Sequence, residues 1–140
     1  MTYYGFDINH ITKLLTAYAL TIPIGWNRER EGHSAGIRTF PLVALASCGY
    51  LLAEANPVDP SATSRVVQGL TAGIGFVGGG AIVRDGTTVH GTATAASIWM
   101  TGAIGCAVAL DHWQTAIVMS LVSLFTLRAL VPIKDRLDKQ

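Results

Sequence analysis

The sequence predicts an all-α fold, a polytopic membrane bundle of five transmembrane helices that forms one domain over residues 1–140. Hydrophobic residues make up 50% of the chain and charged residues only 14%, whereas a soluble domain carries about a quarter charged residues. The charges gather in short clusters between five apolar blocks, each close to the roughly 20 residues needed to cross a bilayer. This composition argues against a soluble enzyme, a nucleic-acid-binding protein and a disordered chain.

The apolar blocks give the helices in order, near residues 8–26, 37–54, 65–83, 92–110 and 112–131. Helices are expected rather than a barrel because the blocks show no period-two alternation. Lys13 falls within the first block, and its long stem is expected to snorkel outward. Asp59-Pro60 predicts an N-cap and a first helical residue ahead of the third block. Asp111 is expected to cap the fifth helix directly after the fourth, and Pro132 to end the fifth.

The basic residues predict the orientation, with the N-terminus outside and the C-terminus cytoplasmic. Eight of the ten basic residues then face the cytoplasm, namely Arg28, Arg30, Arg38, Arg84, Arg128, Lys134, Arg136 and Lys139. Only Lys13 and Arg65 lie outside, and short loops are where the positive-inside rule applies. A four-span arrangement, with one block lying in the membrane interface, would put the two basic clusters on opposite faces and is less favoured.

The third block carries a glycine-rich run, with Gly69, Gly73, Gly75, Gly78, Gly79 and Gly80. Its spacing matches G-x-G-x-x-G, but no strand precedes it and no acid follows about 20 residues on, so a dinucleotide site is rejected. Small residues let helices approach closely in lipid, so Gly69-x-x-x-Gly73 is interpreted first as a packing face. In the alternative interpretation, the three successive glycines break the helix and expose carbonyls to an ion or solute.

The fourth block begins with small and hydroxylated side chains and one indole, at Thr92, Thr94, Ser97 and Trp99. Such a face either packs on the glycine face of the third helix or lines a narrow polar path. Packing is again the favoured interpretation, because small residues are most often used at helix interfaces in membranes.

The richest polar cluster is predicted on the cytoplasmic side, from Arg28, Glu29, Arg30, Glu31, Arg38, Arg84 and Asp85. The arginines alone would serve as anchors to the inner membrane face. A functional interpretation places hydrated magnesium on Glu29, Glu31 or Asp85, since magnesium is usually held through one or two carboxylates. A second functional interpretation has the arginines grip an anionic ligand or a lipid headgroup.

Several kinds of chemistry are not supported by the sequence, and no enzyme is predicted. The four histidines show no metal-ligand spacing, and Cys48 and Cys106 form no C-x-x-C motif. Acidic residues are missing from the interior of the predicted spans, which argues against a proton-coupled pump. A channel lined by carbonyls and hydroxyls would remain compatible with this pattern.

Several runs resemble the MgtC/SapB family of bacterial inner-membrane proteins. They are residues 25–32 (GWNREREG), residues 35–39 (AGIRT), Asp59-Pro60 with Arg65, residues 73–80 (GIGFVGGG) and residues 91–99 (GTATAASIW). The resemblance covers about residues 10 to 130 in the family's order and spacing. The chain departs from the family's pattern at Asn27 and at Ala93 and Met100, and it is expected to lack the ACT-like domain that many members carry.

The resemblance implies a multi-pass protein of the bacterial inner membrane, built as a small helix bundle. Family members are associated with growth at low magnesium, with survival inside host cells and with membrane energetics, through partners such as ATP synthase. The departures at Ala93 and Met100 weaken any transfer of the virulence role.

The leading hypothesis is therefore an accessory or regulatory membrane protein in magnesium or membrane-potential homeostasis, acting through helix contacts with itself or a partner. The alternative is a magnesium or small-ion channel or transporter with a site at the cytoplasmic mouth. A lipid-binding scaffold that uses the arginines is the third hypothesis. The expected partners are the lipid bilayer, further copies of the chain and a membrane protein such as ATP synthase, but no nucleic acid. No cofactor is expected other than a magnesium ion.

Overall fold

The computed structural model describes residues 8–54 and 60–130. These residues form five helices and one short hairpin, in the order α1 (Ile8–Arg30), α2 (Thr39–Glu54), α3 (Pro60–Gly80), β1 (Val83–Asp85), β2 (Thr88–His90), α4 (Thr92–Ala109) and α5 (Trp113–Ala129). The predicted all-α class with five helices is confirmed. The proposed cap at Asp59 and the stop at Pro132 lie outside the described residues.

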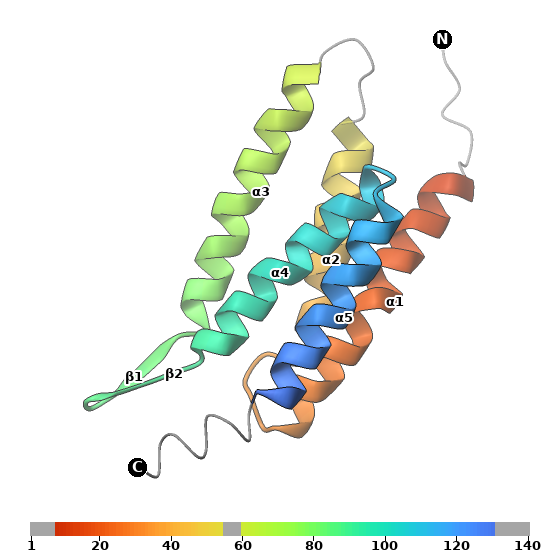
Figure 1. Cartoon of the computed structure of the whole chain (residues 1–140). Coiled ribbons are helices and arrows are strands. Elements are labelled where there is room, and N and C mark those ends of the chain that lie inside the picture. Colours follow the sequence, from red (N-terminus) through yellow and green to blue (C-terminus); the bar gives the residue numbers. More distant parts are fainter. Residues whose placement is uncertain (1–7, 55–59, 131–140) are drawn as a thin grey trace, which may run out of the picture.

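The helix α4 lies at the centre of the bundle and contacts each of the other four helices. Helices α1, α2, α4 and α5 lie close together, whereas α3 diverges from them towards its N-terminal end (Figure 1). The buried side chains at the centre are mostly small or aliphatic, and they include Ile24, Phe40, Ala44, Ile98 and Ile104. Small residues on α4 allow this central position, because helices approach most closely where side chains are short.

Polar and apolar side chains are distributed in the opposite way to those of a water-soluble bundle. On α5, Ser120 and Ser123 are buried, while Leu121 is 61% exposed and Phe125 is 67% exposed. The buried hydroxyls are satisfied within the bundle: Ser120 Oγ donates to the carbonyl of Leu20 at 2.6 Å, and Ser123 Oγ donates to that of Met119 at 2.7 Å. Large exposed apolar patches are rare on soluble monomers, so this pattern favours a helix that faces lipid.

By length and hydropathy, one described helix is long and apolar enough to cross a membrane. This helix is α4, Thr92–Ala109, with a mean hydropathy of 1.3. Two further apolar helices, α2 and α5, are shorter. The prediction of five spans and their orientation therefore stays a prediction.

The hairpin between α3 and α4 was not expected from the sequence, which placed residues up to 83 in the third helix. Helix α3 ends at Gly80, and the N–H groups of Ala81 and Ile82 donate to the carbonyls of Gly78 and Gly79 at 3.0 and 3.1 Å. Glycine has a low helix propensity, so three glycines in succession end the helix rather than interrupt it. Strands β1 and β2 then pair in antiparallel register around Gly86, which has a φ of 59°.

Two predictions at the opposite end of the bundle are wrong. Lys13 does not snorkel outward, because it is 5% exposed and its Nζ donates to Asp111 Oδ2 at 2.7 Å and to the carbonyl of Ala109 at 3.0 Å. Asp111 does not cap α5, whose N-cap position is occupied by His112. A buried ammonium group is costly without a counter-charge, and the turn between α4 and α5 supplies this carboxylate.

Candidate functional site

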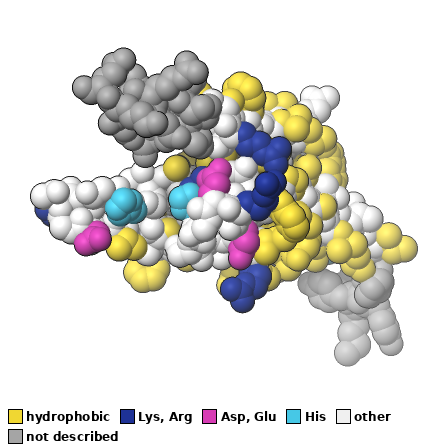
Figure 2. Space-filling view, turned by 90° about the horizontal axis from the view of Figure 1, so that it is seen from below, with side chains coloured by type: hydrophobic (Ala, Val, Ile, Leu, Met, Phe, Trp, Pro, Cys, Tyr) yellow, Lys and Arg dark blue, Asp and Glu magenta, His cyan; other side chains and the backbone are white. Residues whose placement is uncertain are grey.

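The described arginines that are predicted to share one side lie at one end of the bundle, which we call the arginine-rich end: Arg28, Arg30, Arg38, Arg84 and Arg128. Lys134, Arg136 and Lys139, predicted on the same side, lie outside the described residues. They lie near the C-terminal ends of α1 and α5, in the loop before α2 and on the hairpin. Figure 2 views the molecule from this end and shows basic, acidic and histidine side chains gathered over it, with hydrophobic side chains along the flank.

Arg28 is the buried centre of this end, at 4% exposure. Its Nη1 donates to Glu31 Oε2 at 2.7 Å, and its Nη2 donates to Thr94 Oγ1 at 3.1 Å. The guanidinium therefore joins the end of α1 to the start of α4. Its Nε has no acceptor among the described residues, which costs about 1–3 kcal/mol when a donor is buried.

Glu31 and Asn27 continue this network. Asn27, which is 7% exposed, donates from Nδ2 to Glu31 Oε1 at 2.8 Å and accepts at Oδ1 from Arg128 Nε at 3.1 Å. His33 Nε2 lies 3.3 Å from Glu31 Oε2. Burial, together with the charge of Arg28, lowers the pKa of His33. The Glu31 carboxylate is thus engaged at both oxygens by groups of the same chain.

Glu29 holds the loop between α1 and α2 against the end of α1. Its Oε2 accepts the N–H of Ile37 at 3.1 Å. A Cβ at Gly36 would overlap this carboxylate, and a Cβ at Gly25 would lie 2.9 Å from Ile37 Cα. The close approach of the backbone therefore requires glycine at position 25, and Gly36 leaves room for the Glu29 carboxylate, which has a structural role there.

The remaining predicted site residues are not brought into this network. Arg84 Nε donates to the carbonyl of Gly86 at 3.0 Å, within the exposed hairpin that also carries Asp85. Arg38 is exposed beside a separate shallow hollow with Thr39 and Leu42. Sequence reasoning missed Asn27 and Arg128 as site residues, and their separation in the chain gave no signal that they would meet.

The carboxylates considered for magnesium are not gathered at one point. Glu31 is engaged by Arg28, Asn27 and His33, Glu29 binds the Ile37 N–H, and Asp85 belongs to the hairpin. Over residues 8–54 and 60–130, no group of three or more His, Cys, Asp or Glu side chains could hold a metal ion. A magnesium site at this end stays a prediction.

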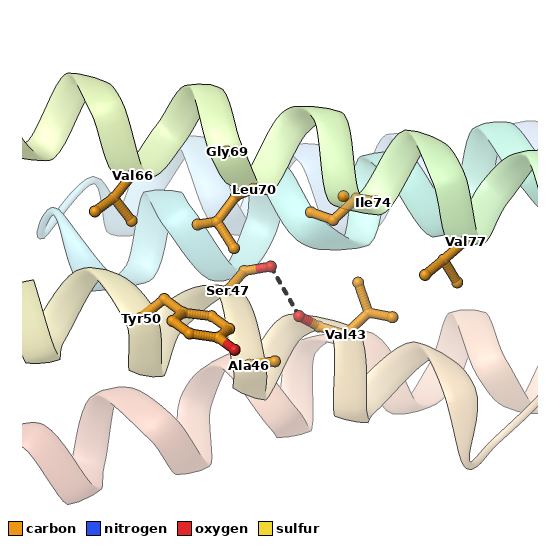
Figure 3. A pocket seen from close by; sticks show the side chains of 10 residues that line it. Val43, Ala46, Ser47, Tyr50, Val66, Gly69, Leu70, Ile74 and Val77 are labelled. Atoms are coloured by element: carbon orange, nitrogen blue, oxygen red, sulfur yellow. Dashed lines mark hydrogen bonds between the residues drawn. The ribbon is translucent and has the colours of Figure 1, made fainter.

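The glycine-rich face of α3 borders an apolar pocket of about 490 Å³ between α2 and α3. Figure 3 shows Leu70, Ile74 and Val77 of α3 on one side of the pocket, with Tyr50 and Val43 of α2 on the other. A Cβ at Gly69 or Gly73, which also line the pocket, would have no neighbour within 4 Å.

The other glycines of α3 differ in their surroundings. Added Cβ atoms at Gly75, Gly79 and Gly80 would meet open space, whereas one at Gly78 would lie 3.2 Å from the Ala95 carbonyl oxygen. Within one copy of the chain, α3 therefore meets the start of α4 closely at Gly78 and leaves its other glycines uncovered.

The hydroxylated start of α4 is divided between two surroundings. Thr94 and Ser97 are buried, and Ser97 Oγ donates to the Ala93 carbonyl at 2.7 Å. Thr92 is exposed, and Trp99 is 50% exposed at a small pocket between α3 and α4. Only Thr94 of this set joins the network of Arg28.

Comparisons with known proteins identify the family of this chain. The MgtC family model matches residues 14–136. The chain is 38% identical to protein SrpB of Synechococcus elongatus, over 82% of this chain and 71% of SrpB. It is 33% identical to protein MgtC of Salmonella typhimurium, over 82% of this chain and 49% of that protein.

A further relative is protein MgtC of Brucella abortus, which is 33% identical over 87% of this chain and 52% of that protein. The chain thus spans about half the length of these MgtC proteins. No solved structure matches it. From the family model and the identity to SrpB, the chain belongs to the MgtC family.

Proposed function

We propose that this chain is a multi-pass inner-membrane accessory or regulatory protein in magnesium or membrane-potential homeostasis. It acts through helix contacts with a second copy or with another membrane protein such as ATP synthase. The observation that carries the proposal is the uncovered glycine face of α3, where Gly69 and Gly73 have open space on the part of the helix that diverges from the bundle. Family membership and the resemblance of the motifs support the physiological context.

Membrane embedding is supported by the distribution of side chains. Large apolar side chains face outward on α5, while serine and threonine hydroxyls lie between the helices. The arginines at one end, opposed by Lys13 and Arg65 towards the other, support an orientation with the arginine-rich end in the cytoplasm. The five helices would then cross the bilayer in alternating directions.

The arrangement of polar groups favours a regulatory role over ion conduction. The carbonyls of Gly78 and Gly79 accept backbone N–H groups, so they are engaged at the end of α3. Lys13 is paired with Asp111, and Glu31 with Arg28. An ion path needs ligands that can bind and release an ion, and these groups are already engaged in hydrogen bonds and ion pairs with each other. A channel or transporter with a site at the cytoplasmic mouth is the alternative.

Substitution at Gly73 tests whether the open face of α3 makes the contact. We expect Gly73→Leu to reduce the oligomer or partner complex recovered by cross-linking in native membranes and by size-exclusion chromatography in mild detergent. Gly75→Leu is the matched control, because it lies two positions away and therefore on the opposite side of the helix, also in open space. Equal assembly of wild type and Gly73→Leu would contradict the proposed interface.

A further inference from the structure

A polar hollow at the arginine-rich end is distinct from the apolar pocket beside α3. It has a volume of about 510 Å³ and is lined by Asn27, Arg30, Glu31 and Arg128, so it lies between the ends of α1 and α5. Among the described residues, neither of its two arginines forms a direct hydrogen bond or ion pair with α3, α4 or the hairpin. The two arginines of the hollow are therefore candidates for binding a ligand.

Among residues 8–54 and 60–130, the charges around the hollow do not cancel. The negative charge of Glu31 is matched by the buried Arg28, whose Nη1 lies 2.7 Å from Glu31 Oε2. Within residues 8–54 and 60–130, no carboxylate forms an ion pair with Arg30 or Arg128. Two positive charges therefore line the hollow without a counter-charge from the described part of the chain.

One of these charges is held in place by a buried amide. Asn27 Oδ1 accepts from Arg128 Nε at 3.1 Å, and the same amide is fixed by its donation to Glu31 Oε1 at 2.8 Å. The terminal nitrogens of Arg128 have no hydrogen-bond partner among the described residues. A guanidinium fixed through Nε and free at its terminal nitrogens suits two parallel bonds to the oxygens of a phosphate.

The surroundings of the hollow suit a ligand that has both a charged group and apolar chains. Phe125 is 67% exposed and precedes Arg128 on α5 by three positions, so the two side chains lie on neighbouring parts of one face. Trp26, next to Asn27 on α1, is 53% exposed, and exposed tryptophans are enriched at the level of lipid headgroups.

We propose that the hollow between the ends of α1 and α5 binds the phosphate group of an anionic ligand through Arg128 and Arg30, with Asn27 as a positioning residue. The phosphate belongs either to an anionic phospholipid headgroup or to free phosphate. The proposal goes beyond the accessory function and does not depend on whether α3 makes an intermolecular contact.

Binding to the full chain in a neutral detergent tests this site. The probes are dioctanoyl phosphatidylglycerol, inorganic phosphate and dioctanoylglycerol, which has the same acyl chains without the phosphate, and titration calorimetry gives the affinities. We expect Arg128→Gln to weaken phosphatidylglycerol binding by about tenfold or more, since a hydrogen bond to a charged group is lost. We expect Arg30→Gln to weaken it as well, and this variant loses no described contact, so it should fold.

Arg84→Gln is the matched control, because it removes one positive charge from the same end but outside the hollow. We expect it to change the affinity by less than about twofold, as for an exposed surface charge. Phosphatidylglycerol binding that depends on Arg128, with none for dioctanoylglycerol, supports the site with a lipid source. Inorganic phosphate binding with the same dependence supports the site with a free phosphate source.

Three results would overturn the proposal. The first is equal weakening by Arg84→Gln and Arg128→Gln, which would mean unspecific attraction to the basic end. The second is equal binding of dioctanoylglycerol and phosphatidylglycerol, which would mean recognition of the acyl chains alone. The third is the absence of binding for both phosphate probes.

Discussion

Helices α3 and α4 both contain glycines, but their glycines have different surroundings. On α4, a Cβ at Gly105 would overlap the Ala44 carbonyl oxygen and lie 3.0 Å from Ser47 Cβ, and a Cβ at Gly102 would overlap the side chain of Ile74. On α3, added Cβ atoms at Gly69 and Gly73 would have no neighbour within 4 Å.

This difference separates two roles that look the same in the sequence. The glycines of α4 are needed for packing within one copy of the chain, because they let α2 and α3 approach the central helix. Most glycines of α3 contribute nothing to the packing of a single copy, and they lower the stability of the helix itself. The glycines of α3 thus lower helix stability without improving the packing of one copy. A second helix that covers this face would explain why they are present.

Adding the same methyl group to each helix tests whether the glycines of α3 and α4 differ in their effect on stability. We expect Gly105→Ala to destabilise the chain by about 1–3 kcal/mol, because the added atom overpacks a filled site. Gly73→Ala should leave the stability of a dispersed chain unchanged or raise it by up to about 1 kcal/mol, from helix propensity alone. Unfolding in mixed micelles, followed by circular dichroism, gives both values. Equal effects at the two positions would refute the distinction.

The next effect concerns the turn that follows the central helix. Asp111→Ala leaves the buried Lys13 ammonium with only the Ala109 carbonyl, so we expect a loss of about 1–2 kcal/mol. Lys13→Met removes the buried charge instead and leaves a carboxylate that is 62% exposed, so it should cost less. The same unfolding assay ranks the two variants. A larger loss of stability for Lys13→Met would show that the unpaired Lys13 ammonium is not the cause of the destabilisation.

The smallest effect is a pH dependence at the end where α4 meets α1. Burial and the charge of Arg28 lower the pKa of His33 below its ordinary value of 6.5, while Glu31 opposes this shift. The unfolded chain therefore takes up a proton at a higher pH than the folded chain, and stability falls as the pH drops through about 6.5. His33→Gln should flatten this part of the stability profile. An unchanged profile would show that His33 does not cause it.

The sequence predicted those parts of the fold that depend on short segments. Apolar blocks located five helices, and the clusters of arginine located one end of the bundle, because both signals are local. The glycine run was identified, but its spacing could not distinguish Gly78, where an added Cβ would meet Ala95, from Gly73, where it would meet open space. That distinction depends on how far α3 diverges from α2 and α4.

The site was predicted only in part, for the same reason. Arg28 and Glu31 lie within one turn of a helix, so their pairing follows from spacing. The contacts of Lys13 with Asp111 and of Arg128 with Asn27 join opposite ends of the chain. These contacts depend on how the helices pack, and the packing cannot be predicted from single residues in the sequence.

We propose that the chain regulates through helix contacts and does not itself conduct ions. The most direct test is magnesium flux into sealed proteoliposomes that contain the purified full chain and a magnesium-sensitive dye, with an ionophore to verify that the dye responds. We expect no more magnesium flux than in empty liposomes, under magnesium gradients and membrane potentials of either sign. Magnesium uptake that requires the protein would contradict the proposed regulatory role.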